Sequence, residues 1–251
     1  MNTWQLKNPL DAILFDCDGT LSQLEGIVAL AEQTGQQDYV AKLTEQAMGA
    51  QGLTPDLYRK RLDCVRPNLK QVEHLGQLYI DKLSADVFET IQILQQADKK
   101  VFILSAGLWP AVALLADYLR VPRIQVFAVP INFTKQGDYQ DFDQNSPLCN
   151  LFGKKMIAEQ IKRNYPRLAL VGDGQNDFEA VETVERFIGY GGNFYREKLF
   201  NAVNFYIRST SLSPVLPLCL MKHEIEKLSK VQQAFCLAAE QWIIAGQVKV
   251  S

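Results

Sequence analysis

Two aspartates, Asp16 and Asp18, stand two positions apart near the start of the chain, directly after the apolar segment 12–15. That segment reads Ala-Ile-Leu-Phe and predicts a short buried strand. Alternate side chains of a strand share a face, so both carboxylates leave the strand on one side. Two like charges this close require a cation, a shared proton or a charged substrate. Because ligands of open α/β sheets bind beyond the carboxyl ends of the strands, this pair is the first candidate for catalysis.

Further polar residues lie at or near the ends of other predicted elements. They are Ser105 after a strand at 101–104, Lys154 at the start of a helix, and Asp173 and Asp177 after a strand at 168–171. Four carboxylates in one place repel each other unless they share a hard cation, and their oxygens suit Mg²⁺. A lysine and a hydroxyl can hold phosphoryl oxygens. One aspartate can act as a nucleophile and a second as general acid and base. Together these residue types indicate metal-assisted phosphoryl transfer.

Strands that alternate with helices are expected to position these residues. Six strands are predicted, at 12–15, 101–104, 124–129, 168–171, 187–188 and 203–207, with a β-hairpin at 131–142. Ser84 is expected to cap a helix at 85–97. This alternation predicts an α/β fold with a doubly wound parallel sheet.

Residues 25–82 interrupt that alternation, because they contain four predicted helices and no strand signal. We interpret them as a small inserted helical cap domain, with residues 1–24 and 83–208 forming the α/β core. Residues 209–251 form a C-terminal extension. From His223 to Ile244 its apolar residues recur at helical spacing and predict one helix. The stripe consists of Ile225, Leu228, Val231, Phe235, Ala238 and Trp242. It either packs on the core or forms a homodimer contact.

Composition narrows the possible partners. The net charge of −2 and the lack of long Lys/Arg runs argue against nucleic-acid binding. Five scattered cysteines without a C-x-x-C pair are expected to be reduced thiols in a cytoplasmic protein. Neither a signal peptide nor an apolar run of membrane-spanning length is visible, so no membrane association is expected.

The motifs resemble those of phosphatases of the haloacid-dehalogenase (HAD) superfamily. Residues 16–20 read D-C-D-G-T, Ser105 follows a strand, Lys154 comes later, and residues 172–177 read G-D-G-Q-N-D. The resemblance narrows to the phosphoserine phosphatases and extends over about residues 10–208. It includes Glu25-Gly26-Ile27 and the segment 187–193, which reads F-I-G-Y-G-G-N.

This resemblance implies a HAD-like Rossmannoid core with a helical cap and a Mg²⁺-dependent phosphomonoesterase of serine biosynthesis. Such an enzyme hydrolyses O-phospho-L-serine through an aspartyl-phosphate. Asp16 would be the nucleophile, and Asp18 the general acid and base. Mg²⁺ would be held by the carboxylates of Asp16 and Asp173 and the backbone carbonyl of Asp18, with Asp177 acting indirectly. The residues implied to bind the phosphate or substrate are Ser105, Ala106, Gly107, Lys154 and Asn176.

The resemblance also assigns the two charges of the amino-acid end of the substrate. Glu25 matches the family's amine-binding glutamate, and Arg61 matches its carboxylate-binding arginine. The residues alone leave simpler interpretations open. Glu25 can favour a helix N-terminus by its charge, and Arg61 can belong to a solvated helix face beside Arg59 and Lys60.

Four residues differ from the family pattern. Ala106 and Lys155 replace glycines, Cys17 stands where an aliphatic residue is usual, and Thr54 stands where a bulky apolar cap residue is usual. Lys155 leaves the catalytic lysine open to a shift by one position. A polar Thr54 is expected to alter cap closure and thereby which phosphomonoester fits. Two other functions therefore remain. One is hydrolysis or transfer of another small phosphoryl group. The other is a catalytically silent binding protein, although such proteins usually lack one of the two motif aspartates, and both are present.

Overall fold

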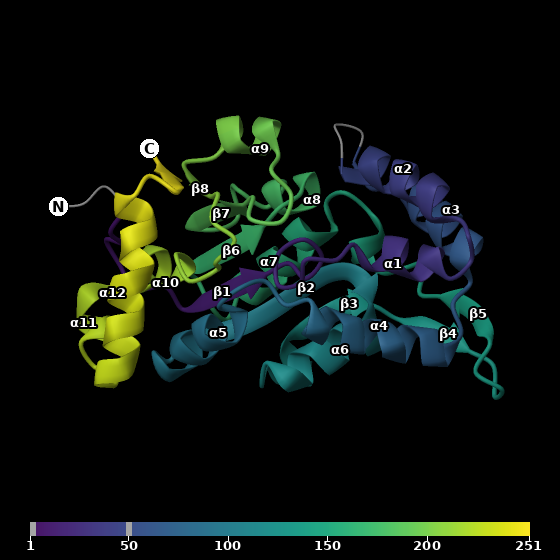
Figure 1. The fold of residues 1–251 in the computed structure, drawn as a ribbon, viewed down its shortest axis with the longest axis horizontal. Coiled ribbons are helices and arrows are strands. Elements are labelled where there is room, and N and C mark those ends of the chain that lie inside the picture. The colour runs from purple at the N-terminus through teal and green to yellow at the C-terminus, as the bar shows by residue number, and fades with distance from the viewer. Residues whose placement is uncertain (1–3, 49–51) are drawn as a thin grey trace.

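A seven-stranded sheet forms the centre of the molecule in this computed structural model, which describes residues 4–48 and 52–251. The strand order is β3-β2-β1-β6-β7-β8-β9, and every neighbouring pair is parallel except β8 with β9. The strands are β1 (Ala12–Phe15), β2 (Lys100–Leu108), β3 (Val126–Val129), β6 (Leu168–Gly172), β7 (Arg186–Tyr190), β8 (Phe205–Ile207) and β9 (Val248–Val250). The predicted doubly wound α/β fold is confirmed (Figure 1).

The register of the central strands brings their polar ends together. Phe15, the last residue of β1, pairs with Ile103 of β2 and with Val171 of β6. All residues of β1 and β6 are buried, as expected for strands covered on both faces. The strand order changes direction at β1, because the chain first builds β2 and β3 on one side and later β6 to β8 on the other. This switch point is where a doubly wound sheet binds its ligands.

Helices connect these strands and cover the sheet. They are α5 (Val87–Gln96), α6 (Trp109–Tyr118), α7 (Gly153–Lys162), α8 (Gln175–Phe178) and α9 (Glu197–Ala202), with short 3₁₀ turns at Arg123–Gln125 and Pro147–Cys149. Two boundaries differ from the prediction. β2 continues through Ser105 to Leu108 instead of ending at Leu104. Ser84 does not cap α5, because its hydroxyl donates to the Thr20 carbonyl at 2.7 Å, and Asp86 precedes the helix instead.

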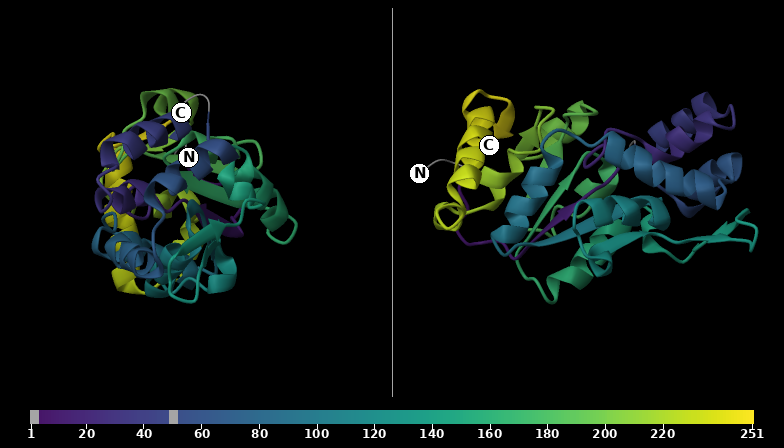
Figure 2. Two further views of the ribbon diagram at one scale, coloured as in Figure 1. Left: turned by 90° about the vertical axis from the view of Figure 1, so that its right-hand side faces the viewer. Right: turned by 60° about the horizontal axis from the view of Figure 1, so that its bottom comes forward.

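Four helices follow β1 as predicted: α1 (Gly26–Glu32), α2 (Gln37–Met48), α3 (Pro55–Val65) and α4 (Leu69–Asp81). Local chemistry sets two of their starts. Thr54 Oγ1 accepts the Leu57 amide at 3.2 Å ahead of Pro55, and Asn68 forms a capping box with Gln71. These helices lie at one end of the sheet, near the hairpin of β4 (Ile131–Phe133) and β5 (Tyr139–Phe142) (Figures 1 and 2).

Within the C-terminal extension, residues 223–244 do not form the single helix that was predicted. The extension forms α10 (Val215–Cys219), α11 (Lys222–Ile225) and α12 (Lys230–Ile244), because a capping box between Ser229 and Gln232 starts a new helix. The buried face of α12 consists of Cys236, Ala239 and Ile243. Three members of the predicted stripe instead are exposed: Val231, at 81% exposure, Ala238, and Trp242, at 38%.

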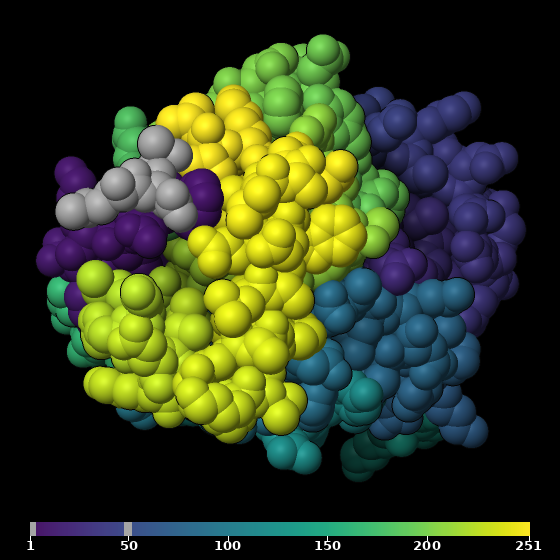
Figure 3. Space-filling view, turned by 60° about the vertical axis from the view of Figure 1, so that its left-hand side comes forward, coloured from purple at the N-terminus to yellow at the C-terminus, as the bar shows by residue number. Residues whose placement is uncertain are grey.

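After α12 the chain adds β9, which was not predicted, to the edge of the sheet beside β8. The extension covers the end of the molecule opposite the four helices (Figures 2 and 3). It is therefore part of the α/β core's own packing. Within the described residues, no helix is long and apolar enough to cross a bilayer.

Candidate active site

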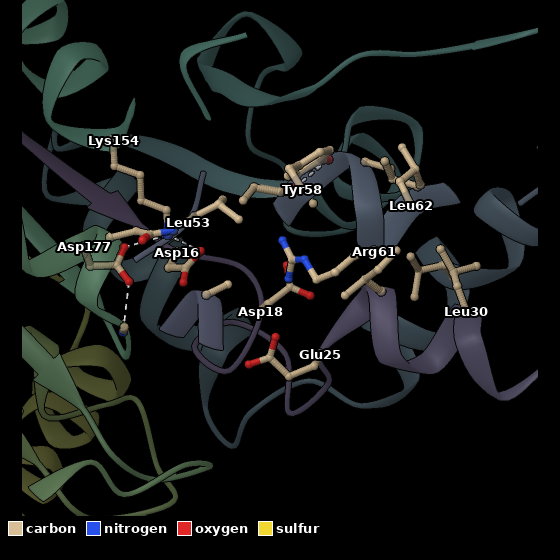
Figure 4. A pocket seen from close by; sticks show the side chains of 18 of the residues that line it. Asp16, Asp18, Glu25, Leu30, Leu53, Tyr58, Arg61, Leu62, Lys154 and Asp177 are labelled. Atoms are coloured by element: carbon tan, nitrogen blue, oxygen red, sulfur yellow. Dashed lines mark hydrogen bonds and ion pairs between the residues drawn. The ribbon is translucent and has the colours of Figure 1, made fainter. Parts of the chain in front are cut away.

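A pocket opens beyond the carboxyl ends of β1, β2 and β6 and extends between them and the helices α1, α3 and α4 (Figure 4). Its lining combines charged residues from the sheet side with apolar residues from the helices. The lining includes Asp16, Asp18, Glu25, Leu30, Leu53, Tyr58, Arg61, Leu62, Tyr79, Ala106, Gly107, Lys154, Asn176 and Asp177. Most of the predicted site residues thus meet at the place where the sheet topology predicts a ligand site.

Asp16 is held so that one of its oxygens is engaged and the other is free. Its Oδ1 accepts the Cys17 amide at 2.7 Å and lies 2.7 Å from Lys154 Nζ. In the described part of the chain, no hydrogen bond or ion pair reaches Oδ2. Burial and the nearby Asp177 carboxylate raise the pKa of Asp16 well above its usual range. The geometry leaves Oδ2 available for attack on an electrophile in the pocket.

Lys154, and not Lys155, is the lysine of the site. Its Nζ lies 2.7 Å from both Asp16 Oδ1 and Asp177 Oδ1, and its side chain is 5% exposed. Burial alone would lower the pKa of Lys154, but these two carboxylates raise it above the usual value, so the amine stays protonated. The structure therefore brings Lys154 to the aspartates, whereas Lys155 is not among the residues that line the pocket; the catalytic role of Lys154 stays a prediction.

Three carboxylates come close enough to share a cation. Each of Asp16, Asp173 and Asp177 offers an oxygen, and the three oxygens lie within 4.8 Å of one another. Asp173 is fully buried, its Oδ1 has no hydrogen-bond partner, and burial raises its pKa to about 6. A buried, unpaired carboxylate oxygen is costly unless something binds it. These residues therefore fit a divalent metal. The Asp18 side chain does not belong to this group.

Arg196, which the sequence did not single out, holds the other oxygen of Asp173. Its Nη2 and Nε donate to Asp173 Oδ2 at 2.9 and 3.2 Å, and Nη2 lies 3.8 Å from Glu25 Oε1. The sequence offers no signal for this role, because Arg196 is one of many scattered cations. The guanidinium thus engages Oδ2 and leaves Oδ1 of Asp173 without a hydrogen bond among the described residues.

Asp18 is surrounded by hydrogen-bond donors. Its Oδ1 accepts the Gly26 amide at 2.6 Å and the Tyr79 hydroxyl at 2.8 Å. Its Oδ2 accepts the Ser105 hydroxyl at 3.2 Å, while Ser105 Oγ accepts the Gly107 amide at 2.9 Å. Ser105 itself is fully buried, and Ala106 and Gly107 form the wall of the pocket. Asn176 is also buried there, with no partner for its Oδ1.

Glu25 and Arg61 lie in the part of the pocket away from Lys154 and Asp177 (Figure 4). Glu25 precedes α1, but its side chain makes no capping hydrogen bond. Burial, with the Asp173 and Asp18 carboxylates, raises the pKa of Glu25 to about 8. Arg61 is 8% exposed, and among the described residues its Nε has no partner and its Nη1 donates only to Thr44, at 3.4 Å. Arg61 therefore does not belong to a solvated helix face.

The apolar residue of the helical wall is Leu53, and the expectation for Thr54 was wrong by one position. Leu53 is 2% exposed and lines the pocket, whereas Thr54 is exposed and serves as the N-cap of α3. Tyr58 and Tyr79 also line the pocket, and Tyr58 donates to the Ala106 carbonyl at 3.0 Å. Sequence reasoning missed these three residues because their spacing only indicates an apolar helix face.

Comparisons with known proteins identify the family to which the chain is related. A family model described as haloacid dehalogenase-like hydrolase matches residues 10–184. The phosphoserine phosphatase of Bos taurus is 33% identical over 199 residues, which is 78% of this chain and 88% of that protein. The phosphoserine phosphatase of Homo sapiens is 32% identical over the same shares. The crystal structure of a phosphoserine phosphohydrolase-like protein from Francisella tularensis has a TM-score of 0.73 at 24% identity, covering 80% of this chain and 96% of that one.

Proposed function

Since the chain belongs to the haloacid dehalogenase-like hydrolases, we propose that it hydrolyses O-phospho-L-serine to L-serine and phosphate. The reaction would be that of a Mg²⁺-dependent phosphomonoesterase with an aspartyl-phosphate intermediate. The relatives named above are phosphoserine phosphatases, and the charges that line the pocket fit the three charged groups of this substrate.

The observation that carries the proposal is the state of Arg61. A guanidinium that is 8% exposed, with an unpaired Nε and no carboxylate partner among the described residues, calls for an anionic ligand. Arginine also presents a fork of donors that matches a carboxylate. Glu25 shares this part of the pocket and offers an acceptor for an ammonium group. One acid and one arginine beside the reactive aspartates suit an amino acid phosphorylated on its side chain.

The phosphate would lie between Asp16 and the turn at residues 105–107. Asp16 Oδ2 forms a bond to phosphorus while the ester P–O bond breaks, and Asp18 gives its proton to the departing serine oxygen. In the second step Asp18 takes a proton from water, whose oxygen attacks phosphorus and releases Asp16. Lys154 stabilises negative charge beside Asp16 during both steps. The side-chain amide of Asn176, which is buried in the same pocket, would be a further donor to the phosphoryl oxygens.

The carboxylates of Asp16 and Asp173 would hold the metal, and Asp177 would act on it directly or through its contacts with Lys154 and the Gly174 amide. We propose Mg²⁺, because an all-oxygen donor set suits a hard cation. When bound, it would supply positive charge that offsets the charge developing on the phosphoryl group. The Asp18 backbone carbonyl remains a proposed ligand.

Residues 25–82 would act as a cap on the core formed by residues 1–24 and 83–208. This segment supplies Glu25, Leu53 and Arg61 to a pocket whose aspartates come from the sheet. The two chain segments that enter and leave it run side by side, with the Gln23 amide donating to the Lys82 carbonyl at 2.8 Å. A pair of adjacent connections is suited to opening and closing a cap.

The test is a panel of phosphorylated metabolites that includes phosphoserine and phosphothreonine, assayed with Mg²⁺ and with a chelator. We expect phosphoserine to give the highest kcat/KM of the panel and the chelator to abolish turnover. A different preferred phosphomonoester would refute the substrate, and phosphate appearing on an added alcohol in place of water would indicate transfer. Equal activity in chelator would refute the metal.

A further inference from the structure

Tyr79, near the end of α4, contacts the residue proposed as general acid and base. Its side chain is fully buried, and its hydroxyl donates to Asp18 Oδ1 at 2.8 Å. The same oxygen accepts the Gly26 amide at 2.6 Å. A carboxylate oxygen has two lone-pair sites, so these two donors use both sites of Oδ1.

We propose that Tyr79 is a positioning residue that confines the transferable proton of Asp18 to Oδ2. The inference rests on the proposed function, because it concerns the acid step of that reaction. With Oδ1 occupied, a proton on Asp18 can only be carried by Oδ2. Oδ2 accepts the Ser105 hydroxyl at 3.2 Å and keeps one site for the proton. Tyr79 thereby selects which oxygen of Asp18 faces the leaving group.

Two glycines make room for this contact. A Cβ on Gly26 would collide with the Tyr79 hydroxyl, and one on Gly107 would lie 3.2 Å from it. The packing of α4 on α6 holds the helix that carries Tyr79, since a Cβ on Gly76 would meet Leu114 at 2.7 Å.

The contribution of the Asp18 proton to the rate of cleavage increases with the basicity of the leaving group. When an alkyl phosphate is cleaved, the bond from Asp16 to phosphorus forms, the ester P–O bond breaks, and the alkoxide oxygen takes the proton from Asp18 Oδ2. A nitrophenolate is stable as an anion and leaves without that proton. Loss of Tyr79 positioning should therefore slow the cleavage of an alkyl phosphate more than that of an aryl phosphate.

The test compares Tyr79→Phe with the wild type on phosphoserine and on 4-nitrophenyl phosphate, measuring release of the alcohol in a single turnover. We expect cleavage of phosphoserine to slow by about 10- to 100-fold, part of the range that general acid catalysis contributes. Release of nitrophenol should slow by less than about threefold, since its departure needs little of that contribution. The KM for phosphoserine should stay unchanged, because Tyr79 does not provide the charges for the amino-acid end.

Tyr190→Phe is the matched control. Tyr190 is also fully buried, and its hydroxyl donates to the Thr210 carbonyl at 2.6 Å, outside the pocket. This variant loses a buried hydroxyl of the same kind and should keep both cleavage rates. If both variants slow both substrates equally, Tyr79 has only a structural role and the inference is wrong.

Gly26→Ala provides a second perturbation of the same hydrogen bond, because the added methyl would overlap the Tyr79 hydroxyl and lie 3.0 Å from Asp18 Oδ1, the two groups that form it. It should show the same selective loss on the alkyl phosphate. The double variant should lose less than the product of the two single losses, since both act through one hydrogen bond. Losses that multiply would overturn the inference.

Failure of the proposed substrate gives a different result. If the wild type cleaves nitrophenyl phosphate but not phosphoserine, the substrate is wrong, and the same comparison is made with the alkyl phosphate that the panel identifies. If the wild type cleaves alkyl phosphates and Tyr79→Phe retains full activity on them, the proposed function stands and the role of Tyr79 is refuted.

Discussion

Two groups of buried charges lie at opposite ends of the same strands, and they differ in how completely they are satisfied. At the carboxyl ends, three carboxylates (Asp16, Asp173 and Asp177) face two cations, and Asp173 Oδ1 has no partner. At the other end, Lys99 precedes β2 and forms an ion pair with Glu224 of α11. One acid meets one base there.

Backbone groups form further hydrogen bonds with both members of the Lys99–Glu224 pair. Lys99 Nζ also donates to the Leu10 carbonyl at 2.7 Å, and Glu224 Oε2 accepts the Met221 amide at 2.9 Å. A balanced, fully bonded pair has nothing left to offer a ligand, so it serves to attach the C-terminal extension to the start of the sheet. Excess charge and an unbonded oxygen at the opposite end instead require a ligand. Burial of charge alone therefore does not identify an active site, whereas its imbalance does.

The largest effect expected from this comparison is on catalysis at the unbalanced group. Asp16→Asn removes the nucleophile and should reduce kcat by at least about 10⁴-fold, as for loss of other enzymic nucleophiles. The variant should keep a cooperative unfolding transition, measured by urea denaturation. Substantial Mg²⁺-dependent turnover would contradict the assignment of Asp16.

Removing the acid of the balanced pair should have the opposite pattern. Glu224→Gln leaves Lys99 buried without a counter-charge, and we expect it to lower the free energy of unfolding by about 3 to 5 kcal/mol. At temperatures where it is folded, kcat should equal that of the wild type. Glu226→Gln is the control, because the exposed pair Lys222–Glu226 is 3.9 Å apart and should contribute under about 1 kcal/mol. An equal decrease in the free energy of unfolding of the two variants would contradict the distinction between the buried Lys99–Glu224 pair and the exposed Lys222–Glu226 pair.

The pH dependence of stability tests whether Glu25 belongs to the unbalanced group. Its pKa rises from 4.5 to about 8, so the folded protein keeps a proton that the unfolded chain loses between these values. The free energy of unfolding is therefore expected to fall as the pH rises from 4.5 to about 8, because the folded protein binds more protons than the unfolded chain in this range. With metal removed by chelator, Glu25→Gln should be more stable than the wild type by roughly 2 to 4 kcal/mol at pH 8. A difference that does not grow from pH 5 to pH 8 would contradict this.

A smaller effect is expected for Arg61, which is proposed to bind the carboxylate of the substrate. Arg61→Ala should raise the KM for phosphoserine by about 10- to 100-fold, the value of a charged hydrogen bond, and leave 4-nitrophenyl phosphate nearly unchanged. Arg59→Ala is the matched control, because the Arg59 side chain is 39% exposed and stacks on Phe142. Equal losses on both substrates would remove the role of Arg61 in recognising a carboxylate.

The sequence by itself determined the α/β fold and the aspartates at its strand ends. The apolar segment 12–15 has the length and composition of a buried strand, and the carboxyl ends of parallel strands meet at one edge. Asp16, Asp18 and Asp173 were therefore identifiable from local pattern alone. Lys154 and Arg61 were also predicted as site residues, but neighbouring lysines and arginines were alternative candidates. Only the burial of Lys154 and Arg61 in the structure distinguishes them from these neighbours.

The tertiary structure alone decided the contacts that join distant segments. Arg196 reaches Asp173 and Tyr79 reaches Asp18 across separations of 23 and 61 residues, for which no periodicity gives a signal. Leu53, and not Thr54, lines the pocket wall, because Thr54 is the N-cap of α3. The family resemblance predicts a pocket residue at position 54. Half of the predicted C-terminal stripe is exposed, because Ser229 starts a new helix whose buried face is formed by Cys236, Ala239 and Ile243. Local pattern specifies elements, whereas the pairing of their polar groups depends on how they pack.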